Sequence, residues 1–219
     1  MALEMFDIRG KTAIVTGGYR GIGRGIADGL AEAGADLVIA ARHLEQCKKA
    51  CSEIQKEFGV KALPFKCDIS KVEDTENLAA FTEKEFGKID VLFNNAGISG
   101  ERKGIMELTD EEWHKTMGID LKGTFNCCRA VTRSMIKQNS GKIINVAASI
   151  YMKGDRYCSD FTAAKGGVVA LTLQMAVEVT RFNITVNCIC PGVMDTGSFA
   201  KHTEYMDFWV PRLPLKRDV

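Results

Sequence analysis

The chain has 219 residues, of which 46% are hydrophobic and 26% charged, and its 29 Lys and Arg against 28 Asp and Glu give a formal charge of +1. This length suits one domain with a large core, and the balanced charge provides no broad basic field for nucleic acid or anionic lipid. The amino terminus carries acids where a signal peptide is basic, and no apolar run reaches the ~18 residues of a membrane span, so we expect a cytoplasmic protein.

Short apolar runs alternate with segments of helical periodicity along most of the chain. Strands this apolar must be covered on both faces, and regular alternation requires parallel strands joined by right-handed crossovers. The sequence therefore predicts an α/β fold of the Rossmann type, a single domain over 1–219 with a doubly wound parallel sheet. The predicted strands are 11–16, 37–41, 61–66, 89–93, 142–147 and 184–189. The predicted helices are 22–33, 44–58, 72–86, 110–136 and 161–181.

The alternation ends at Pro191, and the segment of about 192–213 mixes polar with aromatic residues without a clear period. Two interpretations stay open for this irregular segment. Its aromatic side chains either pack onto the body of the domain or belong to a mobile cover over the substrate.

The cysteines and histidines indicate neither disulfides nor a metal site. No cysteine pair has C-x-x-C spacing, and most of the cysteines lie in apolar runs, so reduced and buried thiols in a reducing compartment are expected. The histidines show no ligand spacing, and we expect no metal. The cysteines are Cys47, Cys51, Cys67, Cys127, Cys128, Cys158, Cys188 and Cys190, and the histidines are His43, His114 and His202.

The turn after the first predicted strand is rich in glycine and leads directly into a helix. Backbone amides of such a turn can surround a phosphate, and the helix dipole favours its negative charge. This pattern between strand and helix predicts a nucleotide-binding site. The turn reads Thr16-Gly17-Gly18-Tyr19-Arg20-Gly21-Ile22-Gly23.

Together with two later motifs, this turn resembles the short-chain dehydrogenase/reductase family, in particular its gluconate 5-dehydrogenases and 3-oxoacyl reductases. The later motifs are Asn94-Asn95-Ala96-Gly97 after the fourth strand and Pro191-Gly192 after the sixth. The similarity continues to Leu213-Pro214-Leu215-Lys216-Arg217, which resembles the segment before the family's final helix and strand. We therefore expect a shortened carboxyl terminus and a sheet without its final strand.

The identity of the nucleotide can be argued from charge. NAD-binding turns usually have an acid about 20 residues after the glycines, where it binds the ribose 2'-hydroxyl. Here Ala40 and Ala41 occupy that place and Arg42 follows, so Arg20 and Arg42 can flank a 2'-phosphate. NADP(H) is expected, and NAD(H) stays open because either arginine could be a solvated surface charge.

The resemblance implies a larger set of cofactor-binding positions along the chain. These are Gly17, Tyr19, Arg20, Gly21, Ile22, Gly23, Arg42, Asp68, Ile69, Asn95, Ala96, Gly97, Lys165, Pro191, Gly192, Val193 and Thr196.

The resemblance also implies a catalytic set of Tyr, Lys, Ser and Asn, of which this chain keeps only the lysine, Lys165. Phe161 stands at the Tyr position, Ala148 at the Ser position and Asp120 at the Asn position. The tyrosine of the family donates a proton as hydride reaches the carbonyl, and phenylalanine has no hydroxyl for this role. Catalysis is therefore expected to be impaired or atypical.

Several residues could replace the missing donor. Ser149 and Tyr157 would each need a local rearrangement, whereas Asp120, Asp160, Thr162 or the substrate itself could supply the proton. Asp120 has a second interpretation, in which it pairs with the lysine or caps a local bend.

The expected function is that of an NADP(H)-dependent oxidoreductase acting on a small alcohol or carbonyl compound. The alternative is a catalytically inactive NADP(H)-binding protein or a partner subunit of an active homologue. The resemblance further implies a homodimer or homotetramer formed through the helices 110–136 and 161–181.

Overall fold

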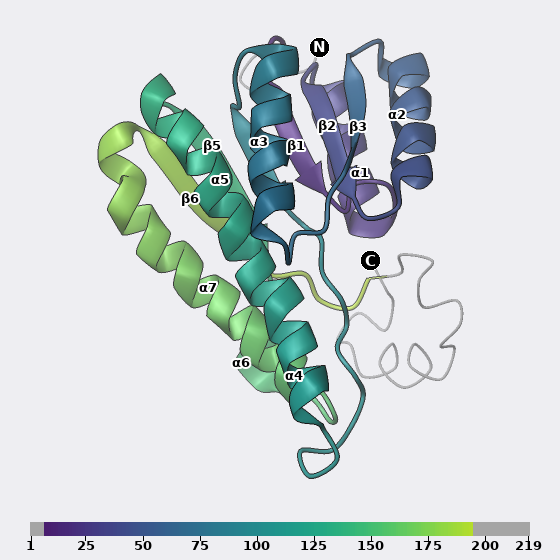
Figure 1. The fold of residues 1–219 in the computed structure, drawn as a ribbon, viewed down its shortest axis with the longest axis vertical. Helices are drawn as coiled ribbons and strands as arrows, with labels where there is room; N and C mark the ends of the chain where they lie inside the picture. The colour runs from purple at the N-terminus through teal and green to yellow at the C-terminus, as the bar shows by residue number, and fades with distance from the viewer. Residues whose placement is uncertain (1–6, 195–219) are drawn as a thin grey trace.

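A parallel six-stranded sheet between two layers of helices makes up the described part of the protein, residues 7–194 of a computed structural model (Figure 1). The Rossmann-type α/β fold expected from the sequence is confirmed. The strands are β1 (Thr12–Thr16), β2 (Asp36–Ala41), β3 (Ala62–Lys66), β4 (Val91–Asn94), β5 (Gly141–Val146) and β6 (Ile184–Ile189). The α-helices are α1 (Gly21–Glu32), α2 (Leu44–Phe58), α3 (Val72–Phe86), α4 (Asp110–Thr116), α5 (Gly123–Gln138), α6 (Ile150–Lys153) and α7 (Ser159–Val179).

The strand order is β3-β2-β1-β4-β5-β6, and every neighbouring pair is parallel. Ala13 of β1 lies opposite Leu37 of β2 on one side and Val91 of β4 on the other. The direction in which strands are added therefore reverses between β1 and β4. In open sheets of this kind, ligands bind beyond the carboxyl ends of the strands at such a reversal.

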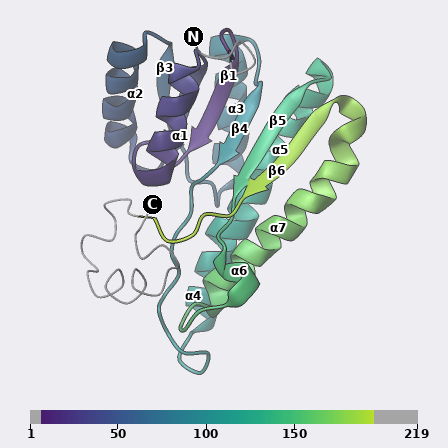
Figure 2. The ribbon, with the colours of Figure 1, turned by 180° about the vertical axis from the view of Figure 1, so that it is seen from behind.

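The strands contribute side chains to two cores, one on each face of the sheet, although β5 and β6 contribute to only one of them. Ile14 and Leu92 pack into the core beneath α3, α5 and α7, whereas Val15 and Ile39 pack into the core beneath α1 and α2. Figures 1 and 2 show these two helical layers from opposite sides. Full burial of each such side chain stabilises the fold by about 1.5–3 kcal/mol, which fixes the strands that carry the site.

The helical stretch predicted over 110–136 is present as one continuous helical segment from Asp110 to Gln138, but its middle is not α-helical. Met117–Lys122 forms a π-helical turn between α4 and α5. Such a turn adds a residue to the helix and rotates the side chains around it, and π-turns are frequent at functional sites. Asp120 lies in this turn and is fully buried.

The edge of the described sheet is β6. In Figure 2, β5 and β6 are seen from the side on which no described helix lies in front of them. Most of the irregular segment expected at 192–213, and Thr196 with it, lies outside the described residues. Within 7–194, no helix is both long and apolar enough to cross a membrane.

All eight cysteines lie in the described part of the chain and are free thiols. Six of them are buried, as expected, whereas Cys188 and Cys190 at the end of β6 are partly exposed. Burial raises the pKa of Cys67 to about 12. The buried thiols are therefore protonated packing residues.

Candidate active site

A cavity of about 830 Å³ opens beside the carboxyl ends of the strands, at the reversal between β1 and β4. Every cofactor-binding position expected from the sequence lines this cavity, apart from Thr196, which lies outside the described residues. The lining members of that set are Gly17, Tyr19, Arg20, Gly21, Ile22, Gly23, Arg42, Asp68, Ile69, Asn95, Ala96, Gly97, Lys165, Pro191, Gly192 and Val193. Their role in binding a cofactor stays a prediction.

The glycine turn has a tight backbone that packs against the end of β4. Gly17 has a φ of +68°, a conformation that residues with a side chain rarely adopt. A Cβ at Gly23 would collide with the Asn95 side chain and the Gly17 carbonyl oxygen. Asn95 Nδ2 donates to the carbonyl oxygen of Thr16 at 3.1 Å. The turn is thus held close to the end of β4, and its residues at the start of α1 line the cavity.

Basic and aromatic side chains line the end of the cavity near β2. The Arg20 guanidinium lies 5.4 Å from the centre of the Tyr19 ring, and that ring meets His43 edge-on at 6.1 Å between centroids. Partial burial opposes ionisation of Asp68, but hydrogen bonds from Ser70 and the charge of Arg42 outweigh burial and lower the Asp68 pKa. This end of the cavity can accept a polyanionic ligand.

A buried ion pair lies at the opposite end of the same cavity. Lys165 Nζ is 3.2 Å from Asp120 Oδ2 and donates to the Val146 carbonyl oxygen at 3.1 Å. Asp120 Oδ1 accepts the Ile98 amide at 2.8 Å. Burial raises the pKa of Asp120, although the Lys165 charge and the Ile98 hydrogen bond oppose that shift. Lys165 lines the cavity and Asp120 does not, so Asp120 can affect a ligand in the cavity through its contact with Lys165.

Apolar side chains occupy the two positions where the resemblance in sequence implies hydroxyl groups. Phe161 and Ala148 both line the cavity, and the Phe161 ring centre lies 5.4 Å from Lys165 Nζ. Ser149 lines the cavity beside Ala148. Tyr157 is 56% exposed and lies away from the cavity walls. Of these two alternatives, Ser149 is therefore the hydroxyl that meets the cavity without a rearrangement.

The remaining sequence candidates for proton donation lie behind the cavity walls. Asp160 is fully buried, and Thr162 has a buried hydroxyl without a hydrogen-bond partner in the described part of the chain. Neither residue is among those that line the cavity. Direct contact between either side chain and a ligand in the cavity would require the walls to move.

Sequence reasoning missed one wall of the cavity. This wall is the loop Ile98–Arg102 after β4, and it faces side chains from α6 and from the start of α7, among them Lys153 and Cys158. The loop has no periodicity, and the four-residue α6 is too short for a helical pattern. The one available signal was the position of the loop directly after Asn94-Asn95-Ala96-Gly97.

A doubly wound sheet with a glycine-rich turn and a basic cavity at its strand reversal defines a dinucleotide-binding domain. A family model described as short chain dehydrogenase matches residues 11–207. The chain therefore belongs to the short-chain dehydrogenase/reductase family of NAD(P)-dependent oxidoreductases.

Characterised relatives agree with this assignment at moderate identity. The chain is 34% identical to a 2-dehydro-3-deoxy-D-gluconate 5-dehydrogenase of Formosa agariphila, over 99% of this chain and 83% of the relative. It is 36% identical to the 3-oxoacyl-(acyl-carrier-protein) reductase FabG of Chlamydia muridarum, over 94% and 84%. A crystal structure of a short-chain type dehydrogenase/reductase from Mycobacterium marinum is 32% identical, with a TM-score of 0.93 over 100% of this chain and 86% of that one.

Proposed function

We propose that this protein is an NADP(H)-dependent oxidoreductase that acts on a small alcohol or carbonyl compound and has an atypical proton-donating group. The observation that carries the cofactor preference is the pairing of Arg20 and Arg42 on the wall of one cavity. The four residues from Ala40 to His43, at the end of β2 and directly after it, include no acid, whereas an NAD-binding site usually has one there. Two guanidinium groups at this place are suited to a 2'-phosphate.

The residues of the cavity fit a bound dinucleotide. The close packing at Gly23 and the positive φ of Gly17 both favour glycine. Because glycine has no side chain, a pyrophosphate could approach the backbone amides of the turn closely. The nicotinamide supplies or accepts the hydride when it is bound. The end of the cavity that holds Lys165, Phe161 and Ser149 would receive the substrate, and we call it the substrate end. Pro191 and Gly192 line the cavity next to Ser149 and would flank the nicotinamide ring.

Proton delivery would depend on the buried ion pair. Lys165 Nζ can release a proton towards the cavity and regain one from water that enters it. The Asp120 carboxylate, 3.2 Å away, would hold the ammonium in place. Burial raises the pKa of Asp120, and the Lys165 charge opposes that shift. Asp120 would then act as a positioning group behind Lys165.

A second candidate function is binding of NADP(H) without turnover. The specific observation in its favour is Phe161, whose ring occupies the place of a hydroxyl group beside the Lys165 ammonium. Ala148 also leaves the cavity wall without the serine that would orient a carbonyl oxygen. The protein could then report cofactor concentration or complete the assembly of an active homologue.

The first test is a fluorescence titration with NADPH and NADH, followed by an activity assay with 2,3-butanedione and ethyl acetoacetate. We expect tighter binding of NADPH, and we expect Arg42→Ala to remove most of that preference. Arg133→Ala is the matched control, because Arg133 is exposed and lies on α5 away from the cavity. Equal affinity for both nucleotides would refute the argument from Arg20 and Arg42.

Restoring the hydroxyl groups separates the two candidate functions. In Phe161→Tyr combined with Ala148→Ser, a competent pocket should gain about 100- to 10,000-fold in rate, the usual contribution of a positioned general acid. An unchanged rate with intact NADPH binding would favour the binding protein.

We also propose that the protein is a homodimer or homotetramer that uses α5 and α7. Apolar side chains stand exposed on these neighbouring helices, with Leu173 66% and Val177 75% exposed on α7 and Phe125 40% exposed on α5. Light scattering should report more than one chain per particle, and Val177→Glu should produce monomers. A wild-type monomer would overturn this assembly, and co-purification with a homologue would favour the partner-subunit alternative.

A further inference from the structure

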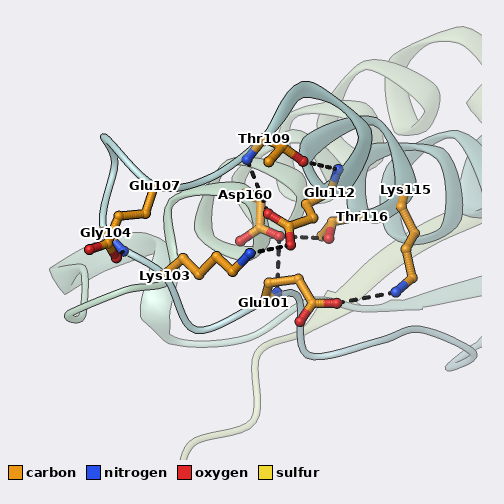
Figure 3. Close-up of polar contacts among 9 residues, drawn as sticks. All are labelled: Glu101, Lys103, Gly104, Glu107, Thr109, Glu112, Lys115, Thr116 and Asp160. Carbon is orange, nitrogen blue, oxygen red and sulfur yellow. Dashed lines mark hydrogen bonds and ion pairs between the residues drawn. The ribbon is translucent and has the colours of Figure 1, made fainter.

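Polar contacts connect the loop after β4 to the helices α4 and α7, as Figure 3 shows. The loop supplies the wall Ile98–Arg102 of the cavity, and α7 carries Phe161 and Lys165. The geometry of the substrate end therefore depends on how firmly this loop is attached to α7.

The buried contact between these two elements is the carboxylate of Asp160. Asp160 lies in the first turn of α7 and is fully buried. Its Oδ2 accepts the Thr116 hydroxyl at 2.6 Å and the Glu101 amide at 3.4 Å. One side-chain oxygen thus joins the end of α4, the loop and the start of α7.

The backbone of the loop is shaped to approach this carboxylate. Gly100 has a φ of +70°, and a Cβ built there would lie 2.6 Å from Asp160 Oδ2 and 2.8 Å from Oδ1. Any larger residue would have to move the loop or the carboxylate. The close approach is therefore built from both sides, by a buried acid and by a glycine.

The other Asp160 oxygen points to a constraint beyond packing. Oδ1 is buried and has no hydrogen-bond partner among residues 7–194. Buried polar atoms without partners are rare in folded proteins, and each one calls for a specific reason. Burying an oxygen without a hydrogen bond destabilises the fold, so packing alone does not explain an acid at position 160.

We propose that Asp160 is a positioning residue that fixes the wall Ile98–Arg102 against α7 and thereby sets the shape of the substrate end of the cavity. Asp160 does not itself line the cavity, so it acts through the loop. This inference rests on the proposed function only for the statement that the cavity holds cofactor and substrate.

Ion pairs on the outside of the same loop provide a contrast. Lys115 Nζ lies 3.2 Å from Glu101 Oε1, and the two side chains are 57% and 41% exposed. Exposed pairs of this kind contribute little to structure in water. Lys115 does not line the cavity, so Lys115→Gln is a matched control that removes a contact of the loop and leaves the Asp160 contact intact.

Two substitutions at Asp160 distinguish its hydrogen bonds from its volume and charge. Because Oδ2 alone accepts both bonds, Asp160→Asn can place its single carbonyl oxygen there and its amide at the Oδ1 site. Asp160→Ala cannot accept either bond. Gly100→Ala disturbs the same contact from the other side of the interface.

The first readout is hydrogen exchange of peptides that cover 98–104, which requires no substrate. We expect exchange to quicken about tenfold or more in Asp160→Ala and Gly100→Ala, with wild-type rates in Asp160→Asn and Lys115→Gln. Exchange in β1 and β2 should not change in any of these variants. Unchanged exchange at 98–104 in Asp160→Ala, or equal quickening in Asp160→Asn, would overturn the proposal.

The second readout uses NADPH with 2,3-butanedione as the probe in the background that carries Phe161→Tyr and Ala148→Ser. Added Asp160→Ala should raise KM about fivefold or more with a smaller change in kcat, because the loop and not the reacting groups has moved. A loss confined to kcat would contradict positioning through the loop. If the wild type binds neither nucleotide, the proposed function fails while the exchange experiment still tests the Asp160 contact.

Discussion

The glycine turn can be tested through a single methyl group. In Gly23→Ala, the new Cβ meets the Asn95 amide and the Gly17 carbonyl oxygen, which have no room to move apart without breaking the turn. Overpacking of this kind costs about 1–3 kcal/mol, whereas alanine in place of a helical glycine contributes about 0.5–1 kcal/mol. With the middle of each range, the difference leaves a net loss of about 1 kcal/mol in the free energy of unfolding.

Gly25→Ala in the same helix is the matched control. No atom of the described residues outside the local helix backbone lies within 4 Å of a Cβ built at Gly25, and Gly25 is exposed. The helical gain of about 0.5–1 kcal/mol therefore acts alone at this position.

Thermal unfolding followed by circular dichroism measures both effects. For a chain of this size, about 1 kcal/mol shifts Tm by about 2–4 °C, so Gly23→Ala should lower Tm by about 2–4 °C and Gly25→Ala should raise it by about 1–4 °C. NADPH affinity should fall only in Gly23→Ala. The reasoning is refuted if the two variants are equally stable, because the Gly23 contact would then have no energetic consequence.

Three further predictions concern titration, thiols and capping. Burial raises the pKa of Asp120 in the folded state above its ordinary value of 3.8. Between 3.8 and the raised pKa, the folded state binds more protons than the unfolded state, so the free energy of unfolding should fall as pH rises through this range. Urea unfolding across pH should show this slope in the wild type and not in Asp120→Asn; a shared slope would contradict it. A thiol reagent should react quickly with Cys188 and Cys190 and with the six buried cysteines only after unfolding, and rapid reaction of all eight in the native state would disagree with the structure. Thr109→Ala should lower the free energy of unfolding in urea by about 1 kcal/mol, because Thr109 and Glu112 form a capping box at the start of α4. An unchanged urea midpoint would show that this cap does not stabilise the protein.

Much of the fold follows from hydrophobic periodicity. The predicted helices 44–58 and 72–86 coincide with α2 and α3, and each ends at a clear local signal. Gly59 and Gly87 both follow these helices in the left-handed conformation that ends a helix. Local sequence carries this information without reference to the rest of the chain.

The π-turn at Met117–Lys122 could not be predicted in this way. Its apolar residues continue the helical period of their neighbours, so periodicity favours an unbroken helix. Asp120 faces inward because it pairs with Lys165 and accepts the Ile98 amide. Those partners lie on distant segments, and their proximity exists only in the folded chain.

The candidate site also has a part that local sequence predicts and a part that depends on tertiary contacts. Motifs that follow strands directly, such as the glycine turn and Asn94 to Gly97, could be placed from the predicted topology, since the carboxyl ends of parallel strands meet at one edge. The loop Ile98–Arg102 and its attachment to Asp160 depend on tertiary contacts with α4 and α7. The sequence could name Asp160 as a polar neighbour of Phe161 but could not show that it lies behind the cavity wall.

The strand order has a consequence for the way the chain is made. During synthesis, β1, β2 and β3 emerge together with the glycine turn and Arg42, but β1 has no neighbour on its other side until β4 has been translated. At the usual ~5–20 residues per second, the stretch from Lys66 to Asn94 takes about 1 to 6 s. Throughout that interval the strand at the centre of the finished sheet is an open edge on which another nascent chain could pair. The side-chain amide of Asn95 can bind the turn only after β4 has been translated, so the phosphate-binding half is begun first but is completed only when β4 and Asn95 have emerged.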